Sequence, residues 1–141
     1  MKGLPINRTQ GLVLGFFGLV WVALVVILVV APEVYDDALR LPGGDLDQAT
    51  LVFLVAISCF IALLVVGVLQ RWRWTFWLIL VAFILGGALR VPASILQLTG
   101  IMSTDLPAWY VVLQAFIGVV EVVVGLLMVA GYRREGTWGS F

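Results

Sequence analysis

The sequence contains no histidine, a single cysteine and few charged residues. Without histidine the chain cannot build a histidine-ligated haem or zinc site, and it lacks the commonest general base of enzymes. Its one cysteine, Cys59, allows neither an internal disulfide nor a CxxC pair, which excludes the quinone-linked thiol oxidoreductases. Acidic and basic residues balance to a formal net charge of zero, so nucleic acid is not expected as a partner. We therefore predict a protein that is not an enzyme and holds no metal or other cofactor.

Apolar residues are present in excess. They make up 63% of the chain, against 11% for charged residues. A soluble domain is about half apolar and about a quarter charged. A chain of 141 residues has too little interior to bury this surplus, so much of it must face lipid. We expect an integral, multi-pass membrane protein that forms one domain over residues 1–141.

Four apolar runs are each long enough to cross a bilayer. A transmembrane helix needs roughly 20 residues, because it rises about 1.5 Å per residue across a hydrocarbon core of about 30 Å. The first run is longer than the apolar core of a signal peptide, so we interpret it as a retained span. The expected spans are residues 10–31, 49–70, 74–98 and 107–132.

Basic residues gather on one side of these spans. They precede span 1, connect spans 2 and 3, and follow span 4: Lys2, Arg8, Arg71, Arg73, Arg133 and Arg134. Lysine and arginine flank membrane spans on the cytoplasmic side, so both termini are expected in the cytoplasm. The predicted fold is an all-α, antiparallel bundle of four transmembrane helices, N-in and C-in. The short loops and this charge asymmetry favour a bacterial cytoplasmic membrane.

The outer loop over residues 32–48 is acidic, with Glu33, Asp36, Asp37, Asp45 and Asp47. We interpret it as a solvated loop, and the alternative is a docking surface for a cationic partner. The acids lack the alternating spacing of an EF-hand, so no metal site is predicted there.

Spans 3 and 4 each carry a stripe of small and polar residues. The stripe on span 3 is Ala82, Gly86, Arg90, Ser94 and Gln97, and that on span 4 is Gln114, Gly118, Glu121 and Gly125. Spacings of three and four residues place each set on one helix face. Small residues let helices approach closely, and polar residues join helices in lipid by hydrogen bonds. The two spans are therefore expected to form a hairpin with a polar-lined interior.

Arg90 and Glu121 are the costly residues of this hairpin. An ionisable group near the bilayer centre costs at least about 2.5–3.5 kcal/mol on insertion scales. Counting from the outer ends of the spans leaves an axial gap of roughly 10 Å between the two residues. Either they form a direct ion pair, or Arg90 reaches outward to headgroups or Gln114 and leaves Glu121 neutral. Any functional site is expected around Arg90, Gln114 and Glu121, with Ser94 and Gln97 nearby.

Small residues also mark spans 1 and 2. Gly11-x-x-x-Gly15 is a helix-contact signature, and Gly18 continues it by about one turn. The predicted helix-packing positions are thus Gly11, Gly15, Gly18, Gly86, Gly118 and Gly125. On span 2, Ala56, Cys59 and Gly67 are expected to mark the inner face, with Cys59 as a small apolar residue. Trp21, in the middle of span 1, is interpreted as a packed or lipid-facing ring, and the alternative is one wall of a ligand or lipid slot.

Two functions fit these features. The first is a small accessory or scaffolding subunit of a larger integral membrane complex, which binds lipid, partner helices or a second copy through its small and polar faces. The alternative is an oligomeric proton-coupled transporter or channel that uses Glu121 and Arg90. An enzyme acting on lipids is disfavoured, because the chain offers neither an acid pair nor a nucleophile next to a base.

Overall fold

The computed structural model describes residues 5–31, 33–34 and 46–140. Within these residues the chain forms long helices and no strand. The helices are α1 (Arg8–Val30), α3 (Leu46–Leu69), α4 (Arg73–Leu98) and α5 (Ala108–Glu135). All four are long and apolar enough to cross a membrane, which confirms the predicted all-α bundle. Most of the acidic loop predicted over 32–48 lies outside the described residues.

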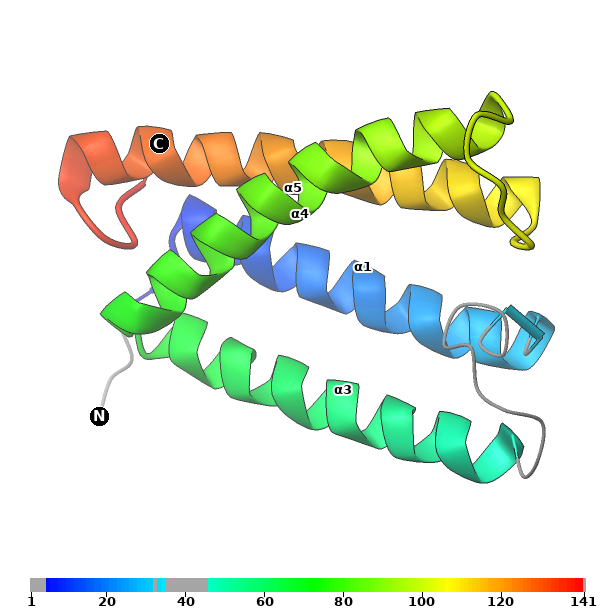
Figure 1. Ribbon diagram of the computed structural model, residues 1–141. Coiled ribbons are helices and arrows are strands. Elements are labelled where there is room, and N and C mark those ends of the chain that lie inside the picture. Colours follow the sequence, from blue (N-terminus) through cyan, green and yellow to red (C-terminus); the bar gives the residue numbers. More distant parts are fainter. Residues whose placement is uncertain (1–4, 32, 35–45, 141) are drawn as a thin grey trace.

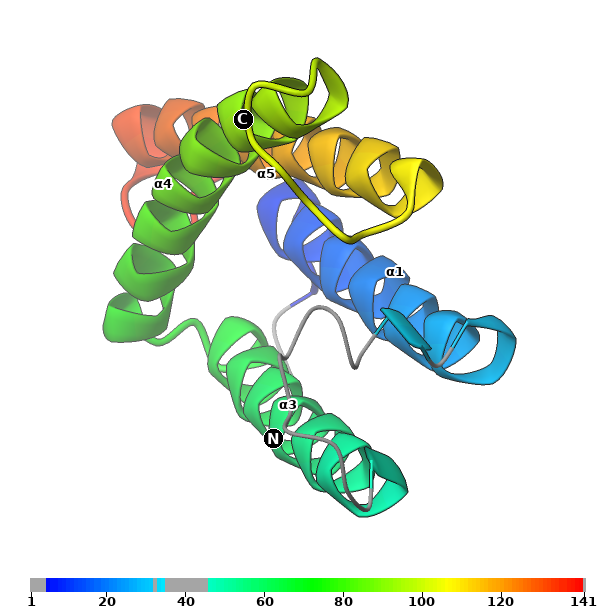
Figure 2. The same ribbon diagram turned by 45° about the vertical axis from the view of Figure 1, so that its right-hand side comes forward.

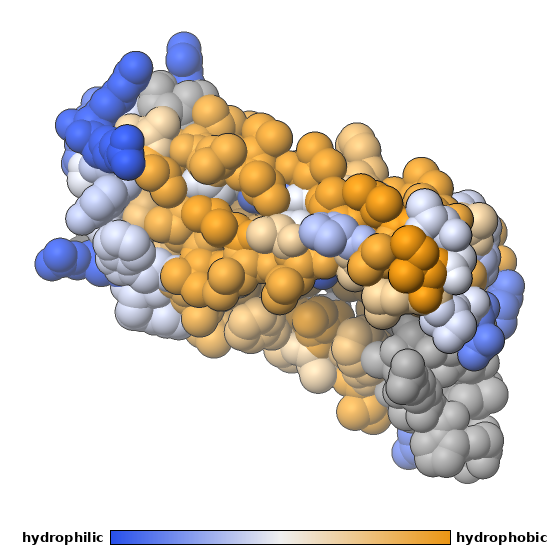
Figure 3. Space-filling view, turned by 45° about the horizontal axis from the view of Figure 1, so that its top comes forward, coloured by the Kyte–Doolittle hydropathy of each residue, from blue (hydrophilic) through white to orange (hydrophobic). Residues whose placement is uncertain are grey.

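The helices alternate in direction, as an antiparallel bundle requires. The start of α1 and the end of α5 lie at the same end of the molecule (Figure 1). We call this the cytoplasmic end, following the predicted orientation, and the opposite end the outer end. Figure 3 shows an apolar middle between hydrophilic ends on one face of the molecule, the pattern of an integral membrane protein.

The predicted span limits differ from the helix ends by at most three residues. Helix α1 begins earlier than predicted because Asn7 caps it: Gln10 N donates to Asn7 Oδ1 at 2.9 Å, and Asn7 N donates to Gln10 Oε1 at 3.2 Å. Helix α5 runs on through Arg133 and Arg134, whose charges suit the negative end of the helix dipole. It stops at Gly136, which has a φ of 85°.

Helices α4 and α5 pack closely along the predicted hairpin. A Cβ atom added to Gly87 would lie 2.5 Å from the carbonyl oxygen of Gly118. One added to Gly125 would lie 2.8 Å from Ile84 Cγ1, and one at Gly118 would lie 3.0 Å from Val91 Cγ2. Gly118 and Gly125 are therefore contact positions, and Gly87 is a third that the stripe analysis did not name.

The glycines of α1 behave differently. A Cβ atom added to Gly11, Gly15 or Gly18 would meet no atom within 4 Å. Within the described residues these positions make no close contact with another helix of the chain, so their packing against a helix outside it stays a prediction. The packed face of α1 instead carries Val13, Phe16 and Phe17, which are buried.

The expected inner face of α3 is also corrected. Ala56 and Cys59 are exposed on the helix surface. Gly67 does make a close contact, against the side chain of Thr75 on α4, because a tight turn joins the two helices there. From that turn α3 and α4 diverge toward the outer end (Figure 2).

The mid-membrane indole of Trp21 joins α1 to α3. Its Nε1 donates to Ser58 Oγ at 2.9 Å, while the ring stays 43% exposed. Interhelical hydrogen bonds of this kind stabilise helix pairs in lipid. The ring is thus a lipid-facing group with a polar contact to the neighbouring helix.

Candidate functional site

A pocket of 490 Å³ lies among the four helices. Small-molecule sites in proteins span roughly 300–1,000 Å³, so the volume suits a small ligand. Its lining residues come from four segments: residues 16–27 of α1, 53–64 of α3, 78–90 of α4 and 110–121 of α5. Each segment extends roughly 16–18 Å along its helix, about half of the hydrocarbon thickness.

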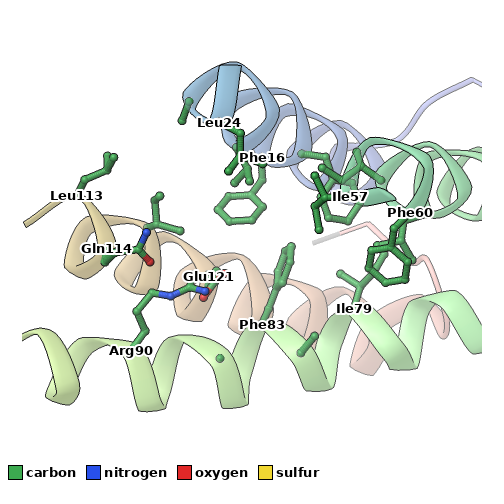
Figure 4. Close-up of a pocket in the computed structure, with 18 of the residues that line it drawn as sticks. Phe16, Leu24, Ile57, Phe60, Ile79, Phe83, Arg90, Leu113, Gln114 and Glu121 are labelled. Atoms are coloured by element: carbon green, nitrogen blue, oxygen red, sulfur yellow. Dashed lines mark hydrogen bonds and ion pairs between the residues drawn. The ribbon is translucent and has the colours of Figure 1, made fainter. Parts of the chain in front are cut away.

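Polar groups occupy one end of this pocket. Tyr110, Gln114 and Arg90 lie toward the outer end, and Glu121 lies deeper. The opposite end, toward the cytoplasm, is lined by apolar side chains such as Phe60 and Ile79 (Figure 4). The pocket is therefore amphipathic along the membrane normal.

Arg90 and Glu121 form a direct ion pair, with 2.7 Å between Arg90 Nη1 and Glu121 Oε1. This decides between the two arrangements left open by the sequence. Side chains on a helix lean toward its N-terminus. The N-terminus of α4 is cytoplasmic and that of α5 is outer, so Arg90 leans inward and Glu121 leans outward (Figure 4). Because the two side chains incline toward each other, they close the axial gap between the residues.

Glycines make room for this pair. A Cβ atom at Gly118 would lie 3.3 Å from Cβ and 3.4 Å from Cγ of Arg90, so the arginine stem passes directly over it. A Cβ atom at Gly86 would lie 3.5 Å from Glu121 Oε2. The small residues of the two stripes thus seat the charged side chains as well as letting the helices approach.

The ion pair leaves hydrogen-bonding capacity in the pocket wall. Among the described residues, Glu121 Oε2 is buried and has no hydrogen-bond partner. Within the same residues, only Nη1 of the Arg90 guanidinium makes a hydrogen bond, although Nε and Nη2 also carry donors. The Arg90 side chain is 35% exposed and that of Glu121 is 11% exposed, so Arg90 is the more accessible partner.

The predicted polar residues separate into two groups. Arg90, Gln114 and Glu121 line the same pocket, where Gln114 also interacts with the Tyr110 hydroxyl. Ser94 is buried and Gln97 is half-buried, but neither lines the pocket. Within the described chain, the polar site is thus smaller on α4 than the stripe predicted.

The aromatic walls of the pocket were missed by the sequence analysis. Phe16, Phe83 and Phe60 contribute rings from three helices. Phe16 and Phe83 pack edge to face with their centroids 4.8 Å apart. A phenylalanine in an apolar span gives no signal of whether it faces lipid, a core or a pocket.

A hydrogen-bonded cluster closes the cytoplasmic end. Gln10 Nε2 donates to Val68 O at 2.7 Å, and Gln10 Oε1 accepts from Arg71 Nε and Nη2 at 3.3 and 3.2 Å. Thr9 Oγ1 donates to Gly139 O at 2.6 Å. These contacts join α1 to the α3–α4 turn and to the C-terminal segment.

The indole of Trp138 completes this closure. Its Nε1 donates to Trp72 O at 2.9 Å, and its ring packs edge to face on Phe76 at 5.2 Å. Trp138 is 2% exposed, while Phe76 and Val68 are fully buried. A packed layer therefore separates the pocket from the cytoplasmic surface. The polar residues Thr9 and Gln10 at the start of α1 could have indicated this closure from the sequence.

The described residues contain no group of three or more histidine, cysteine, aspartate or glutamate side chains that could hold a metal ion. Comparison of the chain with protein-family models, with curated proteins and with solved structures finds no match.

Proposed function

We propose that this chain is a small, non-enzymatic accessory subunit of a larger membrane complex. In this proposal it binds a molecule from the lipid phase in the pocket among its four helices. The observation that carries the proposal is the pocket itself: 490 Å³, lined by all four helices and apolar except for one polar end. Concave, mostly apolar cavities with a few converging polar groups are typical of ligand sites.

Binding fits the pocket better than catalysis. Its carboxylate, Glu121, is already paired with Arg90 at 2.7 Å. Among the described pocket residues there is no second carboxylate, and no nucleophile stands beside a base. The polar groups can orient a ligand, but they do not form a reaction centre.

An accessory role fits the exposed faces of α1 and α3; on α3 these include Ala56 and Cys59. The face of α1 that carries Gly11, Gly15 and Gly18 is open, because nothing lies within 4 Å of a Cβ atom at these positions. Small residues at a free helix face permit close approach by a partner helix or by lipid. The partners proposed for these faces are membrane lipid, another membrane subunit or a second copy of this chain.

A pair of matched variants tests the binding function. Ala82 and Ala88 are both exposed on α4, but only Ala82 is among the residues that line the pocket, so Ala82→Phe places a ring at the pocket and Ala88→Phe does not. The full chain is purified in mild detergent from the membrane in which it was made, and bound small molecules are identified by native mass spectrometry. We expect a retained lipophile with the wild type and Ala88→Phe, and its loss with Ala82→Phe. Equal retention by all three proteins, or none by the wild type, contradicts the proposal.

A proton-coupled carrier is the second candidate. It is favoured by the deep carboxylate of Glu121, whose Oε2 atom has no hydrogen-bond partner among the described residues. Ionisable groups within spans commonly mark proton pathways. In proteoliposomes that carry an internal pH dye, a carrier loses proton flux when Glu121 is replaced by Gln. A binding subunit shows no such flux in either form.

A further inference from the structure

We propose that the pocket selects an uncharged amphiphile: one apolar chain whose head offers carbonyl, ester or hydroxyl oxygens as hydrogen-bond acceptors. The inference rests on the proposed binding function and adds the chemical class and orientation of the ligand. The head lies at Arg90, toward the outer end, and the chain lies among the aromatic rings nearer the membrane centre.

The head end of the pocket offers donors to a ligand. Arg90 gives only its Nη1 group to Glu121 within the described residues, so the donors on Nε and Nη2 stay unused. Gln114 and Tyr110, which interact with each other, add an amide and a hydroxyl from α5 at the same end of the pocket. A head with acceptor oxygens satisfies the unused guanidinium donors, and a plain hydrocarbon does not.

Charge balance selects an uncharged head. The positive charge of Arg90 and the negative charge of Glu121 cancel within one ion pair. An anionic or a cationic head would bring a third charge into a pocket whose walls are mostly apolar. One charge would then lack a partner within the hydrocarbon region, which is strongly unfavourable.

The pocket opens sideways, toward lipid. Phe60 on α3 and Leu78 on α4 both line it, and they are 48% and 43% exposed. They stand on the two helices that diverge from their connecting turn (Figure 2). The cytoplasmic side is closed by the layer that contains Phe76 and Trp138. A ligand therefore reaches the pocket from the hydrocarbon region between α3 and α4.

The polarity of the pocket matches a molecule of the outer leaflet. A lipid there has its head toward the outside and its chain toward the membrane centre. The pocket has its donors toward the outer end and its rings deeper, in the same sense (Figure 4). Such a molecule can enter the pocket laterally from the outer leaflet without reversing its orientation in the membrane.

Three probes with the same monounsaturated chain test the head group: monooleoylglycerol is neutral, oleate is anionic and oleylamine is cationic. Each is titrated against the purified full chain in mild detergent at mildly alkaline pH, and occupancy is read by native mass spectrometry. We expect the wild type to bind monooleoylglycerol about tenfold or more tightly than either charged probe. Ala82→Phe should lose all three, which separates pocket binding from partition into the micelle.

Charge variants make the test specific. Glu121→Gln leaves the positive charge of Arg90 uncompensated, so the preference should turn to oleate. Arg90→Gln should weaken monooleoylglycerol and disfavour oleate further. The double variant Arg90→Gln/Glu121→Gln removes both charges together. It should keep the preference for monooleoylglycerol over the charged probes. It therefore tests the role of charge balance even where a single variant fails to fold.

The outcomes separate the two proposals. If the wild type binds no probe and retains no lipophile, the binding function is wrong. If the wild type binds and prefers a charged probe, or if Glu121→Gln leaves the preference unchanged, the binding function stands and the inference about charge is overturned.

Discussion

Removing one member of the Arg90–Glu121 pair should cost more than removing both. Breaking a buried ion pair from one side typically costs about 3–5 kcal/mol, because it leaves a charge without a partner. The Arg90 side chain is 35% exposed and Glu121 is 11% exposed, so the deeper charge is the carboxylate. We expect Arg90→Met to lower the free energy of unfolding by about 3 kcal/mol, toward the low end of that range.

The partner substitution should be milder. In Glu121→Leu the remaining arginine has a long side chain that can reach outward to the headgroups, where its charge is solvated. In Arg90→Met the carboxylate of Glu121 sits deeper and has no comparable reach. The double variant Arg90→Met/Glu121→Leu should lie within about 1 kcal/mol of the wild type, since well-packed apolar residues often replace a buried pair without loss.

The assay is reversible unfolding in mixed micelles of a mild detergent and sodium dodecyl sulfate, followed by tryptophan fluorescence. The four proteins form a double-mutant cycle, in which the coupling energy isolates the pair from its surroundings. If the costs of the single substitutions simply add in the double variant, Arg90 and Glu121 do not act as a pair, and the reasoning about charge balance in the pocket fails.

Three further predictions use the same unfolding assay. Gly87→Ala places a methyl group 2.5 Å from a backbone oxygen and should cost about 1–3 kcal/mol. Gly15→Ala meets nothing within 4 Å and should change stability by less than about 0.5 kcal/mol; equal costs would mean that α4 and α5 do not meet at Gly87. Trp138→Ala should cost about 3 kcal/mol or more, because the ring is 2% exposed; a neutral result would mean that the C-terminal segment does not close the bundle. Ser58→Ala should cost about 0.6 kcal/mol in the wild-type background and nothing in Trp21→Phe, which lacks the indole donor.

The helices were predictable because hydropathy acts over whole segments. Charged residues are costly in the hydrocarbon region and therefore rare there, so the ends of each apolar run fix the spans to within three residues. At the start of α1 the remaining error comes from local capping. Asn7 and Gln10 extend α1 by a mechanism that is visible in the sequence, through an asparagine followed three residues later by a glutamine.

The ion pair could have been predicted from the sequence by one further consideration, the direction in which helical side chains lean. Axial counting left a gap of roughly 10 Å between Arg90 and Glu121, and their contact stayed undecided. The direction in which helical side chains lean resolves this, because α4 and α5 run in opposite directions. The same step would have shown the glycine at position 118 as the seat of the arginine stem.

The remaining features depend on tertiary structure and could not be predicted from the sequence. Gly11 and Gly15 match a packing signature, yet they face away from the other helices because α1 packs through Phe16 and Phe17 instead. The aromatic pocket lining looks the same as lipid-facing residues in a sequence. Trp138 closes the cytoplasmic end only because the chain turns back after Gly136, where φ is 85°.

Photolabelling tests the lipid-binding claim most directly. A monoacylglycerol with a diazirine in its chain is incorporated into membranes that contain the full chain, and labelled residues are mapped by mass spectrometry after irradiation. We expect adducts on buried pocket residues such as Ile79 and Phe83, lost in Ala82→Phe and retained in Ala88→Phe. Labelling confined to outward-facing residues such as Leu89, which is 72% exposed, and unaffected by Ala82→Phe, would contradict it.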